Sequence, residues 1–370
     1  MPLSRMDMVD EGAMLDLAGP DVRVFPVPGA VVALGKSGTV IIAEASDDAA
    51  ISGVWNSKQF RLIGPAPQPV STRLMGPMPF TAAEKGPELP IHLAIRVDVR
   101  CLYLGVVQVG MCKATEDELS LCHLWIEPPL SRETLAVTRP PVPGAVLPGL
   151  QWLKYVEIDP RHALELFLTD WYTESGPASP SSLVPGFVPP ALAHFYHLAE
   201  RRPAILGRQN FIEPPTGLAS SNNGERMVFA VENQGGWDWS IPWQSDAGDV
   251  DPAVALTTLD VPVPEQEPLS RFLLQFSLHE AAVTAPYQAG VRGPVEQLMP
   301  LLESLLQRVP LLPFMSPIVP KTFLAGPGVI VQVSPGRRDT GEVAVGIGAH
   351  HRSALKPLGQ LDIEWRGFDG

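Results

Sequence analysis

The 370-residue sequence has few cysteines and no long hydrophobic run. Its three cysteines fall within a short interval of a large chain, which argues against a disulfide framework and favours a reducing compartment. Proline interrupts the longest apolar stretches, and none reaches the roughly 18 residues that a membrane-spanning helix needs. The first twelve residues contain no apolar run, and Asp7, Asp10 and Glu11 lie where a secretory signal needs basic charge. We therefore predict a cytoplasmic protein that does not bind membranes.

Motifs for nucleotide binding and nucleophilic catalysis are also missing. Residues 343–348 contain two glycines of a dinucleotide fingerprint, but the third glycine is absent, so glycines at a strand end are the better interpretation. No Gly-x-Ser-x-Gly elbow occurs. His279 and Glu280 have no neighbouring nucleophile or second carboxylate, and a hydrogen-bonded helix end explains them better than acid–base catalysis. The sequence predicts no catalytic residues and no cofactor.

The histidines and cysteines do not follow the spacing of a metal site. His194 and His197 are three residues apart, whereas the metalloprotease pair is four apart with an intervening glutamate. Cys112, Cys122 and His123 include no CxxC pair, so the cysteines are better interpreted as small buried residues. We therefore expect no bound metal.

Positive charge is scarce in one segment of this acidic chain, whose net charge is −13. Residues 209–291 contain eleven acids and two bases, Arg226 and Arg271, so this segment alone has a net charge of −9. Acidic fields repel phosphate backbones and attract basic proteins. The segment predicts no nucleic-acid binding, and it is open to two interpretations: a solvated, solubilising face or a surface for a basic partner.

At 370 residues the chain is too long for one ordinary core and suits two or three domains. Hydrophobic residues make up 45% of it, which is enough to form sizeable cores. Apolar and β-branched runs at residues 29–44, 92–99, 102–109 and 122–126 predict strands, the first of them a hairpin. We expect no helix before about residue 158 and a long loop at residues 65–90. Residues 1–145 are thus predicted to form a mostly antiparallel β domain of unknown role.

A proline-rich stretch around residues 139–148 marks the predicted domain boundary. Residues 146–190 are expected to be a linker with one helix, which begins at Asp159 and Pro160. Residues 191–370 are expected to form an α+β domain. Its helices should begin near Pro190 and Pro268 and span residues 299–309, and its strands should span residues 227–231, 239–243, 328–333, 342–347 and 361–365.

Trp237, Trp239 and Trp243 lie within seven residues and would share one face of an extended segment. Large aromatic residues in a sheet usually belong to the core. An exposed tryptophan ringed by carboxylates would instead be a strong anchor for a protein partner. The sequence leaves both interpretations open.

Several segments in the second half resemble one family. The resemblance rests on residues 189–199 (PPALAHFYHLA), 227–235 (MVFAVENQG), the Trp239–Trp243 strand, Asp251-Pro252 and residues 269–281 (LSRFLLQFSLHEA). Together they resemble the SUKH superfamily of bacterial immunity proteins and yeast cell-wall-synthesis regulators, over about residues 185–285 and into the C-terminal region. Residues 1–145 have no counterpart in this pattern.

The resemblance implies a helix-on-sheet domain without catalysis, which neutralises a co-encoded bacterial toxin of nuclease or deaminase type. A regulatory or scaffold protein that docks a host enzyme is the alternative, and an enzyme of unrecognised type is the third possibility. We expect the partner to be a basic protein toxin or another protein. The predicted partner-binding residues are Glu232, Trp237, Asp238, Trp239, Asp246, Asp249 and Asp251.

Overall fold

The computed structural model describes residues 3–44, 56–75, 89–115, 117–138, 145–172, 188–221, 224–243, 251–258, 261–316, 318–336 and 341–370. The chain divides into two compact units. Unit 1 comprises Met1–Pro143 with Asp369, and unit 2 comprises Gly144–Phe368 with Gly370. No helix among the described residues is long and apolar enough to cross a membrane.

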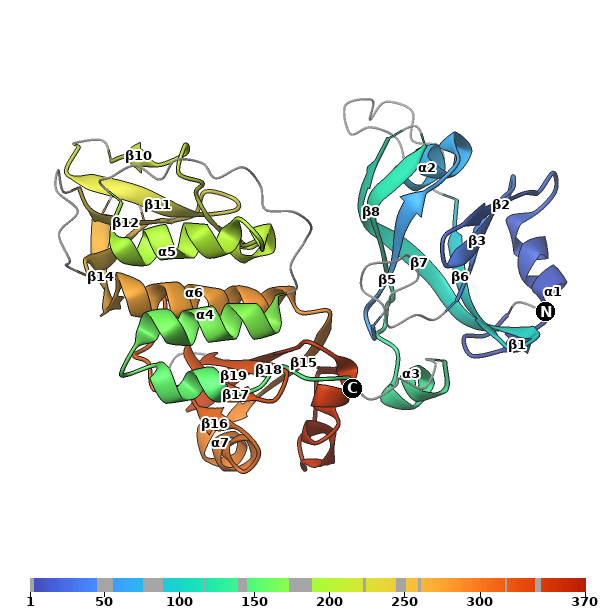
Figure 1. Ribbon diagram of the computed structural model, residues 1–370. Coiled ribbons are helices and arrows are strands. Elements are labelled where there is room, and N and C mark those ends of the chain that lie inside the picture. Colours follow the sequence, from blue (N-terminus) through green and yellow to red (C-terminus); the bar gives the residue numbers. More distant parts are fainter. Residues whose placement is uncertain are drawn as a thin grey trace. The chain divides into compact units, whose positions relative to one another are not determined.

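Unit 1 is built on one sheet (Figure 1). Its strands are β1 (Met8–Val9), β2 (Arg23–Val27), β3 (Ala30–Leu34), β4 (Thr39–Ala43), β5 (Gln59–Pro65), β6 (Ile91–Val97), β7 (Arg100–Ala114) and β8 (Glu118–Trp125). They follow the order β2-β3-β4-β6-β7-β8-β5, and β1 pairs with β7. The predicted hairpin is confirmed, because β3 and β4 pair antiparallel around residues 35–38.

The described strand pairs of unit 1 are antiparallel except β4 and β6, which pair in parallel because residues 44–90 are long enough for a crossover. The expected mostly antiparallel sheet is thus confirmed. The expectation of no helix before about residue 158 is wrong, because three helices precede it: α1 (Glu11–Leu15), α2 (Gln68–Met75) and α3 (Arg132–Thr138). Helix α2 lies in the expected loop at residues 65–90, and its Val70 and Leu74 pack into the core under the sheet. Residues 76–88 of that loop lie outside the described residues.

Unit 2 contains two sheets. The β11 sheet has the order β10-β11-β12-β13-β14, with β9 paired to β11. Its strands are β9 (Asn210–Ile212), β10 (Ala219–Ser220), β11 (Arg226–Glu232), β12 (Asp238–Pro242), β13 (Ala253–Thr258) and β14 (Val261–Pro268). The β18 sheet has the order β16-β17-β18-β19-β15-β20. Its strands are β15 (Tyr287–Pro294), β16 (Gln307–Arg308), β17 (Thr322–Gly326), β18 (Val329–Pro335), β19 (Glu342–Ala349) and β20 (Gly367–Phe368).

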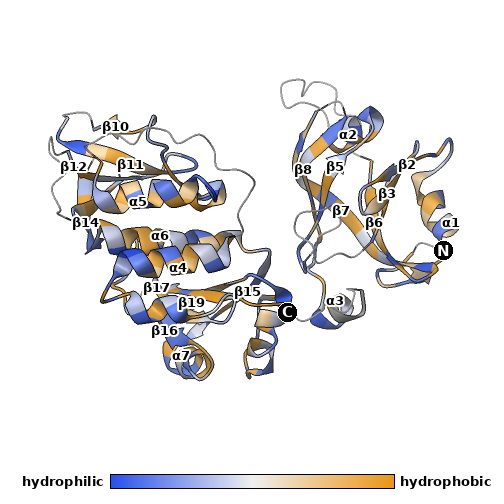
Figure 2. Cartoon of the chain, viewed as in Figure 1, coloured by the Kyte–Doolittle hydropathy of each residue, from blue (hydrophilic) through white to orange (hydrophobic). Residues whose placement is uncertain are grey.

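Helices lie between these two sheets (Figure 1). They are α4 (Pro160–Trp171), α5 (Pro190–Ala199) and α6 (Leu269–Thr284). Helix α6 contacts α4 and α5, strands β13 and β14 of one sheet, and strands β18 and β19 of the other. Because α6 has neighbours on all sides, it is buried almost all round, and α4 and α5 show the alternation of hydrophobic and hydrophilic segments in Figure 2 that suits half-buried helices.

The local signals for these helices are confirmed. Asp159 caps α4 by accepting a hydrogen bond from the backbone N–H of His162 at 3.1 Å, and Pro160 follows as the first helical residue. Helices α5 and α6 begin at Pro190 and directly after Pro268, as expected. The coarse expectation of a mixed chain with helices and mainly antiparallel sheets is therefore confirmed.

Three expectations for unit 2 need correction. The region predicted as a linker contributes Trp152 and most of the apolar face of α4 to the main core of unit 2. The helix expected at residues 299–309 is α7 (Val295–Glu303), which contains Pro300 in its interior and ends before β16. Residues 361–365 form no strand, and the last strand is β20, which pairs with β15.

Candidate functional site

Trp239 belongs to the core. Its side chain is 0% exposed and stacks on Phe314, with ring centroids 6.0 Å apart. It also contacts Phe272 and Phe276 of α6, and its indole Nε1 donates to Glu265 Oε1 at 3.0 Å. Strand alternation directs Trp239 towards α6, so the prediction that it forms part of an exposed partner-binding surface is wrong.

The other two tryptophans of the cluster lie closer to solvent. Trp237 is half-buried and meets Trp239 edge to face, with ring centroids 6.3 Å apart. Its indole Nε1 is buried and has no hydrogen-bond partner among the described residues. Trp243 directly follows β12 and is 38% exposed. Of the two tryptophans predicted to bind a partner, Trp237 and Trp239, only Trp237 is partly accessible.

Glu232 stabilises a turn. Its buried carboxylate accepts hydrogen bonds from the backbone N–H of Gln234 at 2.8 Å and of Gly236 at 3.1 Å, and from the side-chain amide of Gln209 at 3.2 Å. These bonds fix the β11–β12 turn, where Gly235 has a φ of +73° that favours glycine. Glu232 was predicted to bind a partner, but its carboxylate is buried and holds the chain's own backbone.

Asp251 stabilises the start of α6. Its carboxylate accepts a hydrogen bond from the backbone N–H of Ser270 at 2.8 Å and another from the Ser270 hydroxyl. The N-cap position is Pro268, whose side chain cannot cap, so Asp251 supplies the missing acceptor from a distant loop. Asp238 is half-buried near Arg226. Burial lowers the pKa of Arg226, and the negative charge of Asp238 acts against this shift. Asp246 and Asp249 lie outside the described residues.

Glu280 fixes the loop before β9. It is 1% exposed, and its two oxygens accept from the backbone N–H groups of Arg208, Gln209 and Asn210 at 2.8, 3.0 and 2.9 Å. The side-chain amide of Asn210 donates a fourth hydrogen bond at 3.0 Å. The carboxylate of a helix residue thus accepts hydrogen bonds from the backbone N–H groups of a loop that lies about seventy residues earlier in the chain.

These contacts change the interpretation of the acidic segment. Of the eight acids of this segment that the structure describes, four are buried, and each accepts a hydrogen bond from a backbone N–H: Glu232, Glu265, Glu267 and Glu280. Charge-assisted bonds of this kind are stronger than bonds between neutral groups. A large part of the negative charge therefore organises the fold of unit 2, and the residue count overstates the charge on its surface.

A buried polar cluster lies where α6 meets the β18 sheet. His279 Nδ1 lies 2.9 Å from Gln332 Oε1, and the Gln332 amide donates to the His279 carbonyl at 3.1 Å. The expected hydrogen-bonded helix end is thus present, with both His279 and Glu280 buried. Burial lowers the pKa of His279 to about 3 and that of Lys321 to about 8. Burial also raises the pKa of Glu265, whereas the positive charge of the nearby Lys321 ammonium acts to lower it.

The histidine in this cluster predicts a pH dependence of stability. The unfolded chain takes up a proton at His279 near pH 6.5, whereas the folded chain resists this down to about pH 3. Stability is therefore lost as the pH falls below about 6.5, with a slope of up to about 1.4 kcal/mol per pH unit. His279→Asn keeps a side-chain N–H near the Nδ1 position and cannot take up this proton.

The measurement is urea unfolding of both proteins from pH 7.5 to 4. The stability advantage of the wild type over His279→Asn should shrink as the pH falls, since titration of the carboxyl groups is common to both. Parallel curves for the two proteins would show that His279 is not held neutral.

Two cysteines face each other in unit 1. Cys112 on β7 and Cys122 on β8 are Cα partners, and all three cysteines are free thiols. A hydrogen bond from Cys122 lowers the pKa of Cys112, and the same pairing together with burial raises the pKa of Cys122. The sequence interpretation as buried small residues fits Cys101 and Cys122, whereas Cys112 is only half-buried. The pairing was missed because strand register brings together residues that no local motif connects.

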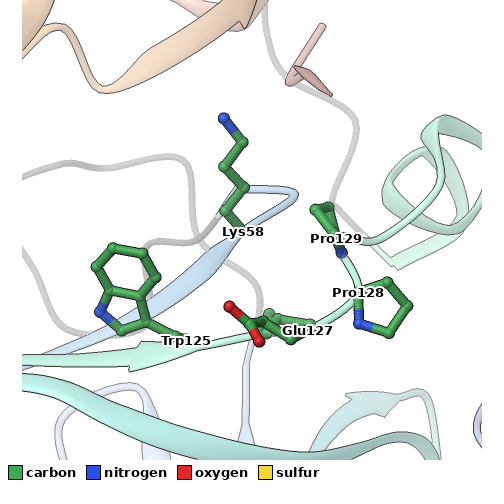
Figure 3. Close-up of a pocket in the computed structure, with 6 residues that line it drawn as sticks. Lys58, Trp125, Glu127, Pro128 and Pro129 are labelled. Carbon is green, nitrogen blue, oxygen red and sulfur yellow. The ribbon is translucent and has the colours of Figure 1, made fainter. Parts of the chain in front are cut away.

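A hollow of about 520 Å³ in unit 1 is lined by an exposed aromatic residue, two charges and two prolines. Figure 3 shows its lining side chains Lys58, Trp125, Glu127, Pro128 and Pro129. Trp125 is 47% exposed. A Cβ at Gly110 would lie 1.3 Å from its indole Nε1, so the indole lies directly against the β7 backbone. This surface offers one aromatic plane and one charge of each sign, which does not define a reaction.

The described part of the chain has no cluster of three or more His, Cys, Asp or Glu residues that could hold a metal ion. Comparison of the chain with family models, with curated proteins and with solved structures finds no match.

Proposed function

We propose that this chain is a non-catalytic, protein-binding immunity protein that neutralises a co-encoded bacterial toxin of nuclease or deaminase type. The proposal starts from the resemblance of residues 185–285 to the SUKH superfamily. The packing of α6 on strands β13 and β14 of the β11 sheet supports it, because the resemblance implies a helix-on-sheet domain. A cytoplasmic location is part of the same proposal.

The observation that carries the proposal is the set of hydrogen bonds made by residues of the segments that resemble the family. Glu232, Asp251 and Glu280 come from three separate segments of the resemblance, and each satisfies backbone N–H groups within unit 2. Residues that organise loops and turns in this way are what a family with a shared fold and no shared active site would have in common.

We place the partner-binding surface at the β11–β12 turn. The turn residues 233–236 are exposed, and Glu232 holds the turn in one conformation. Trp237 and Asp238 follow directly and are half-buried. A turn that is already ordered loses little conformational freedom on binding, and a partly accessible tryptophan beside it can supply apolar contact area.

The test is co-expression with the protein encoded beside this gene, followed by co-purification and a toxicity assay. Binding and protection are expected, and Trp237→Ala should weaken binding by about 2 kcal/mol. Asp238→Lys should slow association with a basic partner, whereas Glu296→Lys, an exposed charge reversal on α7, should leave it unchanged. Thermal midpoints of all variants separate lost binding from lost folding.

Absence of binding to any neighbouring gene product would refute the immunity proposal. A deletion phenotype that persists after the neighbouring gene is removed would instead favour a regulatory or scaffold role.

A further inference from the structure

Another cavity in unit 1, of about 770 Å³, lies between the β2–β3 hairpin and α2. Arg23 and Leu34 are Cα partners across the hairpin, and Phe25 is two residues from Arg23 on the same strand. Strand alternation therefore places Arg23, Phe25 and Leu34 on one face, which lines the cavity. The opposite wall comes from α2. This volume falls in the range of pockets that bind small molecules.

Positive charge dominates this cavity, although the chain as a whole is acidic. Its lining includes Arg23, Lys36 and Arg73, against a single acid, Asp21. Three bases and one acid leave a net charge of +2 in a chain whose net charge is −13. Asp21 is engaged by Lys36, whose Nζ lies 2.6 Å from its carboxylate. The charges of Arg23 and Arg73 remain for a ligand.

Neither arginine forms an ion pair with a described residue. Arg73 Nη1 is buried and has no hydrogen-bond partner in the described part of the chain. The Arg23 guanidinium lies over the Phe25 ring, 5.1 Å from its centroid. A buried N–H without an acceptor costs free energy, and a ligand oxygen would remove that cost.

We propose that this cavity binds a small organic phosphate. Guanidinium groups match phosphate oxygens in geometry and charge, and the net charge of +2 matches a phosphate monoester dianion. Phe25 and Leu34 offer an apolar wall against which the organic part of the ligand can pack. The cavity lies within unit 1, so this inference does not depend on the protein-binding function proposed for unit 2.

The experiment is calorimetric titration of the full chain with adenosine monophosphate, and with adenosine and inorganic phosphate as separate probes. Adenosine monophosphate should bind more tightly than either fragment, and its affinity should fall as salt rises. Arg23→Gln and Arg73→Gln should each weaken binding by at least about tenfold, because each removes a charge-assisted hydrogen bond. Lys113→Gln removes an exposed charge that does not line the cavity and should bind as the wild type does.

Arg23 is exposed, so its variant keeps the test valid if Arg73→Gln lowers the thermal midpoint. No measurable binding of adenosine monophosphate would overturn the proposal. Wild-type affinity in Arg23→Gln, or equal weakening in Lys113→Gln, would overturn it too. Equal affinity for inorganic phosphate would refute the role of the apolar wall and with it the organic class of the ligand.

Discussion

Replacing Glu280 with alanine is expected to lower the free energy of unfolding by about 4 kcal/mol. The change leaves the backbone N–H groups of Arg208, Gln209 and Asn210 without the acceptor that the buried Glu280 carboxylate supplies. Glu280→Gln should cost less stability, because its side chain keeps one acceptor oxygen. It should still cost some, because the NH2 group that replaces the other oxygen would face N–H donors. Urea unfolding followed by circular dichroism and tryptophan fluorescence measures both.

The matched control for Glu280 is Glu296→Ala on α7. Glu296 is exposed, and its replacement should change stability by no more than about 0.5 kcal/mol. A Glu280→Ala protein as stable as this control would mean that the loop at residues 208–210 does not need its carboxylate anchor.

Replacing Trp239 with alanine is expected to cost about 3–5 kcal/mol of stability. The change opens a cavity among Phe272, Phe276 and Phe314 and leaves Glu265 without its indole donor. Trp239→Phe refills much of the space, so its cost of about 1–3 kcal/mol should come mainly from the lost hydrogen bond to a buried carboxylate.

Trp243→Ala provides the comparison, because Trp243 directly follows the same strand but is 38% exposed. It should change stability by less than about 1 kcal/mol. Thermal and urea unfolding of the three variants test the order Trp239→Ala, Trp239→Phe, Trp243→Ala. Equal losses at Trp239 and Trp243 would contradict the assignment of Trp239 to the core.

The sequence predicted those elements whose signals are local. Helix α4 has its aspartate cap and proline, α5 and α6 follow prolines, and the β3–β4 hairpin has two apolar runs around a short turn. Helix α2 was missed because it is short and because its Val70 and Leu74 gain their role by packing on a sheet formed by distant segments. Periodicity within eight residues gives too little signal for that.

The candidate site shows the same division. The sequence identified Glu232, Trp239 and Asp251 as important, but it could not distinguish a carboxylate exposed to a partner from one that holds backbone N–H groups. That distinction depends on long-range contacts, such as the one between Glu280 and residues 208–210. The cavity with Arg23 and Arg73 was missed for the same reason, since fifty residues separate the two arginines.

Strand β14 ends the β11 sheet, and its composition bears on how the protein behaves at high concentration. Its exposed Val261 and Val263 alternate with Pro262 and Pro264. Proline has no N–H to donate, and in a sheet it occupies edge positions whose nitrogen faces solvent. A strand of another chain that paired with this apolar edge would lack two hydrogen bonds, because Pro262 and Pro264 of β14 have no N–H to donate. The same residues that make the edge hydrophobic are thus interleaved with residues that protect it from sheet extension and aggregation.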